Sequence, residues 1–189
     1  MKIPRYQQVM ACAACLMGAC GLRAGINEWT RLGQDTGAVK ALAVDPTNAG
    51  TLYAAAGTGL FKSTDGGMSW SALNAAPGCR VSALVIDPQD PGTIYAASGD
   101  SGIFKSTDGG ASWNPANSGL PPDNAGHYGI TSLAMDPQDP GTLYVGIGRD
   151  SGGVFKTTDG AASWTFASPG LPDAAVMALA LDPQNRGTV

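Results

Sequence analysis

Carboxylates are the most numerous side chains in this 189-residue chain that could do acid–base chemistry, since it holds fourteen aspartates and one glutamate. Inverting hydrolysis of a glycosidic bond needs two carboxylates facing each other across a cleft, about 6.5–9.5 Å apart. Nine aspartates recur at fixed places in an internal repeat, and we expect these to serve its turns. The other five lie in loops rich in Gly, Pro and Ser and are the candidates for such chemistry: Asp35, Asp100, Asp123, Asp150 and Asp173.

Two short segments resemble the nucleophile loop of trypsin-type serine proteases, namely 99–102 (Gly-Asp-Ser-Gly) and 150–153 (Asp-Ser-Gly-Gly). A serine nucleophile needs a histidine base, and His127 is the single histidine of the chain. It also lacks the Ala-Ala-His-Cys context of those proteases. Because both segments align with a tight turn at 57–59, we interpret them as turns.

Metal and nucleic-acid chemistry have little support in the sequence. There is no Cys/His pair with zinc spacing and no Asp-x-Asp-x-Asp-Gly calcium loop, so we predict neither a metal nor another cofactor. The formal charge of −4 and the lack of a Lys/Arg cluster beyond the first residues argue against a nucleic-acid partner, because phosphate binding needs a basic stripe.

One loop is a candidate binding site. The segment 117–129 is longer than its counterpart after Trp70 and contains His127 and Tyr128. An aromatic ring and an imidazole on a long loop could stack on a sugar or contact a protein. The alternative, a spacer in which His127 is merely exposed, stays open.

An eight-residue phrase, S/T-x-D-x-G-x-x-W with one variation, occurs three times, and its aspartates (Asp65, Asp108 and Asp159) lie 43 and 51 residues apart. A repeat of about 40–50 residues with strand-like content is typical of a propeller blade. The first unit predicts four short strands, at 39–44, 51–56, 60–63 and 70–73. Corresponding strands follow from Val81 and from Ile130.

The predicted fold class is therefore all-β, a β-propeller built of four-stranded antiparallel blades. We expect the repeats to fill residues 27–189, as about three complete blades with partial blades at both ends. Residues 27–32 match a fourth strand, with Trp29 at the tryptophan position, and 176–183 match a first strand. This pattern indicates a fragment of a larger propeller, and a four-bladed ring with a defective last blade is the alternative.

The phrase itself predicts a hairpin clasp. The aspartate can accept hydrogen bonds from turn N–H groups, the hydroxyl adds another, and the glycine supplies a positive φ. The tryptophan can pack against a neighbouring sheet. These structural positions are Ser63, Asp65, Gly67, Trp70, Ser106, Asp108, Gly110, Trp113, Thr157, Asp159 and Trp164, with Ala161 replacing the glycine in the third copy.

These residues resemble the Asp-box, or bacterial neuraminidase, repeat found in sialidases, sortilin-type receptors, xyloglucanases and photosystem II assembly factors. The resemblance covers residues 29–189 and implies a β-propeller, whereas the functions of such proteins range from enzymes to receptors. It brings little support for a sialidase, which would use a tyrosine nucleophile paired with a glutamate and an arginine cluster. Glu28 is the only glutamate, the Arg-Ile-Pro signature is absent, and Tyr53, Tyr95 and Tyr144 occupy equivalent repeat positions that indicate packing.

The first twenty residues are typical of an export signal, with Lys2 and Arg5 before an apolar run from Val9 to Ala19. Residues 17–20 resemble a bacterial lipobox, which would make Cys20 a lipidation site, and simple cleavage near Gly21 is the alternative. We therefore expect a periplasmic, cell-envelope or extracellular protein that meets a membrane only through such an anchor.

The functional prediction is an exported, non-catalytic propeller that presents a surface to an unknown protein or glycan partner. The alternative is a fragment of a xyloglucanase-like or other glycoside hydrolase whose catalytic residues lie on further blades.

Overall fold

The computed structural model describes residues 38–73, 80–148, 152–171 and 175–182, and these residues form three β-sheets and no helix. Each sheet has four antiparallel strands that pair in chain order. The strands are β1 (Val39–Val44), β2 (Leu52–Ala56), β3 (Gly59–Ser63), β4 (Ser71–Ala72), β5 (Val81–Ile86), β6 (Ile94–Ser98), β7 (Gly102–Ser106), β8 (Asn114–Pro115), β9 (Ile130–Met135), β10 (Leu143–Ile147), β11 (Gly153–Thr157) and β12 (Thr165–Phe166).

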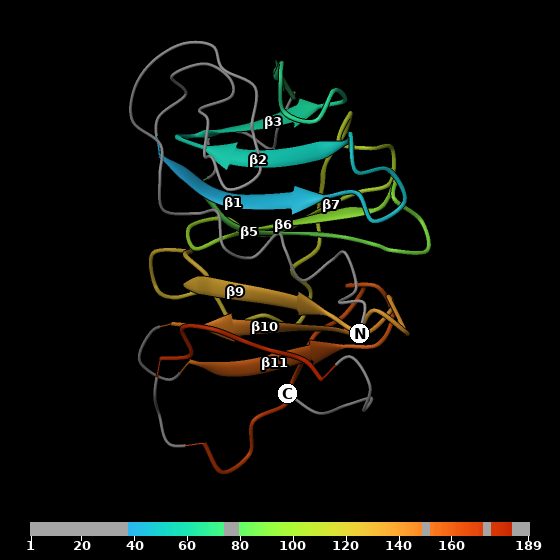
Figure 1. The fold of residues 1–189 in the computed structure, drawn as a ribbon. Helices are drawn as coiled ribbons and strands as arrows, with labels where there is room; N and C mark the ends of the chain where they lie inside the picture. Colours follow the sequence, from blue (N-terminus) through green and yellow to red (C-terminus); the bar gives the residue numbers. More distant parts are fainter. Residues whose placement is uncertain (1–37, 74–79, 149–151, 172–174, 183–189) are drawn as a thin grey trace.

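The three sheets follow one another in space as they do in the chain (Figure 1). The first strand of each sheet lies beside the first strand of the next, β1 beside β5 and β5 beside β9. Hydrophobic side chains fill the space between the first and second sheets, and a second cluster fills the space between the second and third. The core is therefore divided between two sheet-to-sheet interfaces.

Strand β6 shows how the sequence produces this stacking. Side chains alternate between the two faces of a strand, so a strand that is covered on both faces must be apolar or small throughout. All five residues of β6 are buried. Ile94 and Ala96 pack toward the first sheet, whereas Tyr95 and Ala97 pack toward the third.

The prediction of an all-β fold with four-stranded antiparallel blades is confirmed, and most strand positions agree to within one or two residues. The fourth strands are shorter than expected, since each contributes only two exposed residues that pair with the third strand. The segment 176–183, predicted as the first strand of a partial blade, forms no strand within the described residues 175–182, and the partial blade stays a prediction. A first strand pairs with a second strand, and the described part of the chain contains none for it. Trp29 and the partial blade at 27–32 lie outside the described residues.

We find no helical segment in the described ranges with the length and apolarity that a bilayer crossing requires.

Candidate functional site

The three copies of the repeated phrase form turns with the same hydrogen bonds, each between the third and fourth strand of a sheet. In the second copy the Ser106 hydroxyl accepts a bond from the buried Gly110 N–H (2.9 Å) and donates to Asp108 (2.8 Å). Asp108 also accepts bonds from the Ser112 N–H (2.9 Å) and the Ser112 hydroxyl (2.5 Å). Equivalent bonds occur at Ser63, Asp65, Gly67 and Ser69 and at Thr157, Asp159, Ala161 and Ser163.

These bonds set the protonation of the three carboxylates. The Ser112 hydroxyl and N–H, followed by the Ser106 hydroxyl, lower the pKa of Asp108 to about 2. The corresponding bonds lower the pKa of Asp65 to about 2 as well, and bonds from Ser163 and Thr157 hold the pKa of Asp159 still further below its usual value. A carboxylate that stays ionised and accepts several short bonds within its own turn is a poor general acid or base.

The role of the serine that precedes each tryptophan was not predicted from the sequence. Ser69, Ser112 and Ser163 each donate a backbone and a side-chain bond to the box aspartate. Their recurrence at one place in all three units was the signal that could have identified them.

Stability should fall in acid as these carboxylates are protonated. In the unfolded chain Asp65 and Asp108 titrate near 3.8, whereas in the fold their pKa is about 2. Because the folded pKa is the lower one, the ionised form stabilises the fold above the unfolded pKa, and this contribution is lost as the pH falls toward the folded pKa. We expect the urea midpoint to decrease as the pH drops from about 5 to about 2. An Asp65→Asn, Asp108→Asn variant should show a shallower decrease over the same range, and an unchanged slope would contradict the assignment.

The third copy differs from the others at its second glycine position. Gly67 and Gly110 have φ values of 91° and 89°, and Ala161 keeps the same left-handed backbone with φ 68°. An added Cβ at Gly110 would lie 2.8 Å from a methyl carbon of Leu73 on the first sheet. At Ala161 the Cβ is buried in the cluster between the second and third sheets, against which Ala116, the counterpart of Leu73, also packs.

The tryptophans of the second and third copies differ in their environment. Trp164 is only 3% exposed, and its indole N–H donates to the Ala116 carbonyl of the preceding sheet (2.8 Å). Trp113 is half-buried, and its N–H donates to the Gly110 carbonyl of its own turn (3.1 Å). Both rings therefore pack at a sheet-to-sheet interface, but only the indole N–H of Trp164 bonds across its interface, whereas that of Trp113 bonds within its own turn.

The tyrosines equivalent across the repeats also have structural partners. Tyr95 and Lys105 face each other across β6 and β7, with the ammonium 5.3 Å from the ring centroid. Both donate to the Gly160 carbonyl in the box of the next sheet, at 3.1 and 3.0 Å. Tyr53 and Lys62 donate in the same way to the Gly109 carbonyl, at 3.2 and 3.3 Å. We refer to this arrangement as the Tyr–Lys clamp.

The loop at 117–129 is fixed at its beginning by bonds to both neighbouring sheets. Asn117 accepts from the Ile103 N–H (2.6 Å) and donates to the Ser101 carbonyl (3.3 Å). The Ser118 carbonyl accepts a hydrogen bond from the backbone N–H of Trp164 (2.8 Å). Gly119 follows with φ 91°, and a Cβ there would lie 2.2 Å from the Trp164 carbonyl oxygen, so only glycine fits.

The end of the loop is fixed as well. Tyr128 and Gly129 both donate to the Gly99 carbonyl, at 3.0 and 2.7 Å. Tyr128 is half-buried and packs against the cluster between the second and third sheets. Leu120, 5% exposed, is part of the same cluster. Between these anchors, residues 121–127 are exposed without interruption.

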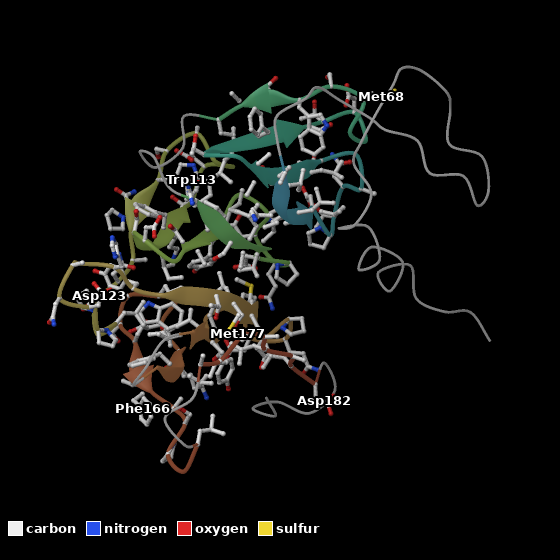
Figure 2. All side chains as sticks on the ribbon, turned by 90° about the vertical axis from the view of Figure 1, so that its left-hand side faces the viewer. Met68, Trp113, Asp123, Phe166, Met177 and Asp182 are labelled. Carbon is white, nitrogen blue, oxygen red and sulfur yellow. The ribbon has the colours of Figure 1, made fainter. Side chains whose placement is uncertain are left out.

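The exposed tip has its own internal turn. Asp123 accepts from the N–H groups of Ala125 and His127, both at 2.8 Å, and its other oxygen lies 3.7 Å from His127 Nδ1. The His127 and Asp123 side chains are 55% and 39% exposed. Figure 2 shows Asp123 at the edge of the molecule, on a loop that extends away from the sheets. His127 is thus presented on an ordered tip, while Tyr128 lies at its base.

A groove of about 310 Å³ lies between the second and third sheets, beside the third box. Its charged lining groups have partners already, because Lys105 bonds to Gly160 and Asp159 to its own turn. Within the described residues we find no group of three or more His, Cys, Asp or Glu side chains that could hold a metal ion. Of the loop aspartates proposed for acid–base chemistry, the structure describes only Asp100 and Asp123, both exposed. Asp35, Asp150, Asp173 and Cys20 lie outside the described residues.

The stacked four-stranded sheets with box turns define the class of Asp-box β-propeller repeats. Within that class, a family model described as "Sortilin, neurotensin receptor 3" (Sortilin-Vps10) matches residues 58–185. The chain belongs to this family. No curated protein matches the sequence.

Solved structures share the fold. An ancestral GH74 enzyme is 22% identical with a TM-score of 0.64, over 75% of this chain and 20% of that chain. The GH74 enzyme of Niastella koreensis is 29% identical with a TM-score of 0.58, over 69% of this chain and 22% of that one. The GH74 xyloglucanase from Xanthomonas campestris is 25% identical with a TM-score of 0.59, over 71% and 24%. This chain therefore spans about a fifth to a quarter of the length of these proteins.

Proposed function

We propose that this chain is an exported, non-catalytic β-propeller repeat protein that presents the tip of its 117–129 loop to a protein or glycan partner. The observation that supports the proposal is the anchoring of this loop on both sides of an exposed tip. A loop that is already ordered loses little conformational freedom on binding, so more of the contact energy appears as affinity.

The aspartates and tyrosines that could have acted as catalytic groups make structural hydrogen bonds instead, and this supports a binding role. The described box aspartates accept bonds within their turns, and Tyr53 and Tyr95 belong to the Tyr–Lys clamps between sheets. Export is supported by the N-terminal signal pattern of residues 1–20, and lipidation at Cys20 stays a prediction.

A glycan-binding assay tests the proposal. Purified chain is titrated with xyloglucan oligosaccharides and with bacterial cell-envelope fractions, and binding is measured by calorimetry and co-sedimentation. For whichever probe binds, a His127→Ala, Asn124→Ala variant should reduce the affinity by at least about tenfold, the effect of losing about 1.4 kcal/mol of contact energy. Met68→Ala is the matched control, because Met68 is 72% exposed on the first box turn. Binding that survives the tip substitutions would exclude the loop as the site.

The identity of 25–29% to GH74 enzymes favours one second candidate, a part of a glycoside hydrolase. Release of reducing ends from xyloglucan by this chain, abolished by Asp123→Asn or Asp100→Asn, would replace the binding proposal with the hydrolase. We expect no release.

A further inference from the structure

The groove beside the third box is opened by a small residue at the interface between the second and third sheets. At the first interface, a Cβ added at Gly110 would lie 2.8 Å from a methyl carbon of Leu73, so this leucine covers the box glycine. Ala116 is the counterpart of Leu73, because the backbone N–H of each donates to the third strand of its own sheet at 2.9 Å. Ala116 and Ala161 both line the groove of about 310 Å³. The alanine at 116 therefore leaves unfilled a space that a leucine side chain would occupy.

Polar side chains lie along this groove. Asn114 faces Lys105 across β7 and β8, Thr107 belongs to the second box, and Ser118 lies near the start of the 117–129 loop. The side chains of Asn114, Thr107 and Ser118 are exposed and make no side-chain hydrogen bond within the described part of the chain. In the first sheet Ser71 occupies the place of Asn114. The asparagine amide reaches further than a serine hydroxyl and offers two donor hydrogens and an acceptor oxygen.

The charged groups of the groove have opposite signs, and both are held by the fold. The Lys105 ammonium donates to the Gly160 carbonyl at 3.0 Å. The Asp159 carboxylate accepts bonds from Thr157 and Ser163 in its own turn. An ionic ligand would meet a charge of its own sign beside the opposite one, so the lining does not favour an ion. A neutral ligand with several hydroxyl groups can use both, because a hydroxyl donates to a carboxylate and accepts from an ammonium or an amide.

We infer that this groove is a binding site for a neutral sugar ring, whose hydroxyl groups are held by Asn114, Thr107 and Ser118. Small-molecule sites combine apolar surface with a few polar groups and have volumes from about 300 Å³ upward. The groove is at the lower end of this range, so it accommodates one or two sugar units. Pro115 and Ala116 supply the apolar surface for the C–H groups of the ring. This site is separate from the exposed tip at 121–127 and goes beyond the proposed function, which does not depend on it.

Titration of the isotopically labelled whole chain with glucose, galactose and cellobiose, followed by heteronuclear NMR, tests the inference. We expect at least one of these sugars to shift the backbone amide signals of Thr107, Asn114, Ala116 and Gly160 in a saturable way. Glucuronate and protonated glucosamine are the charged counterparts of glucose and should bind more weakly than the neutral sugars. Equal or tighter binding of either charged sugar would overturn the assignment to a neutral ligand.

Two variants test the floor and the rim of the groove separately. An Ala116→Leu, Ala161→Gly variant reproduces the residue pair of the first interface and fills the groove with a side chain that this fold already accepts there. It should weaken sugar binding at least about tenfold. Asn114→Ser places the residue of the first sheet at the rim and should weaken binding about fivefold, because hydrogen bonds of the amide are lost. Asn114 is exposed, so this second variant should fold even if the first does not.

The matched control is Ser71→Ala, at the place of Asn114 in the first sheet, and it should leave the sugar affinity unchanged. Thermal melts verify that each variant is folded. Absent saturable shifts with all three neutral sugars would overturn the inference, as would undiminished affinity of the folded groove variants. Shifts confined to residues 121–127 would also overturn it, while leaving the proposed function of the loop tip in place. Conversely, sugar binding in the groove with no ligand at the tip would support the inference and contradict only the proposed function.

Discussion

Replacing Trp164 by alanine should lower the free energy of unfolding by about 3–5 kcal/mol, the range for removing a buried tryptophan. The ring is 3% exposed within the cluster between the second and third sheets, and its N–H holds the Ala116 carbonyl of the preceding sheet. The substitution therefore leaves a cavity and an unsatisfied carbonyl at one interface. Hydrogen exchange should become faster in β9–β12 while β1–β3 change little, since each repeat is stabilised chiefly by its neighbours.

The matched control is Trp113→Ala, at the same position of the second box. Its side chain is half-buried and its N–H bonds within its own turn, so a smaller loss of about 1–2 kcal/mol is expected. Urea denaturation of the two variants measures the difference. Equal losses would show that both tryptophans make the same contribution and would contradict the distinction between the two interfaces.

Replacing Ser106 by alanine should cost about 1–3 kcal/mol, because the buried Gly110 N–H loses its acceptor. Ser106 is 1% exposed, so water cannot easily take the place of the hydroxyl. The substitution also removes the bond that Ser106 donates to Asp108.

The third copy of the box provides the control for this prediction. Thr157 makes the same two bonds, from the Ala161 N–H at 3.1 Å and to Asp159 at 2.6 Å. Ser106→Thr should therefore keep most of the stability in chemical denaturation. A threonine variant as unstable as the alanine variant would show that packing of the side chain, and not its hydroxyl, determines the loss.

The repeat made much of the fold predictable, because three aligned copies reveal which positions vary and which do not. The first strand at 39–44 agrees with β1 at both ends. The fourth strand expected at 70–73 shrinks to Ser71–Ala72, since only these residues pair with β3. Strand propensity did not reveal how short the fourth strand is, because its length depends on how many of its residues pair with β3 at the exposed edge of the folded sheet.

The candidate site was only partly predictable. Loop length identified the segment 117–129 and its exposed His127. The anchors Asn117 and Leu120 depend on contacts with residues elsewhere in the chain, so local sequence could not reveal them. The lysines of the clamps had a detectable signal, because a Phe-Lys pair precedes the box in every unit, at Lys62, Lys105 and Lys156. For Lys62 and Lys105, the glycine carbonyl of the following sheet that accepts their hydrogen bonds became visible only in three dimensions.

Two neighbouring positions differ between the two sheet-to-sheet interfaces. The first interface combines Leu73 with Gly110, and the second combines Ala116 with Ala161. This difference limits how such repeats can be recombined. The alanine at 161 stands where the preceding unit offers Ala116, while a Cβ at Gly110 would meet a Leu73 methyl carbon at 2.8 Å. A gene-shuffling event that moved the third unit behind the first would bring the larger residues of both units together. A unit that looks interchangeable in an alignment therefore packs best behind the unit that precedes it in this chain. Duplication of adjacent pairs of units should be tolerated better than transposition of single units.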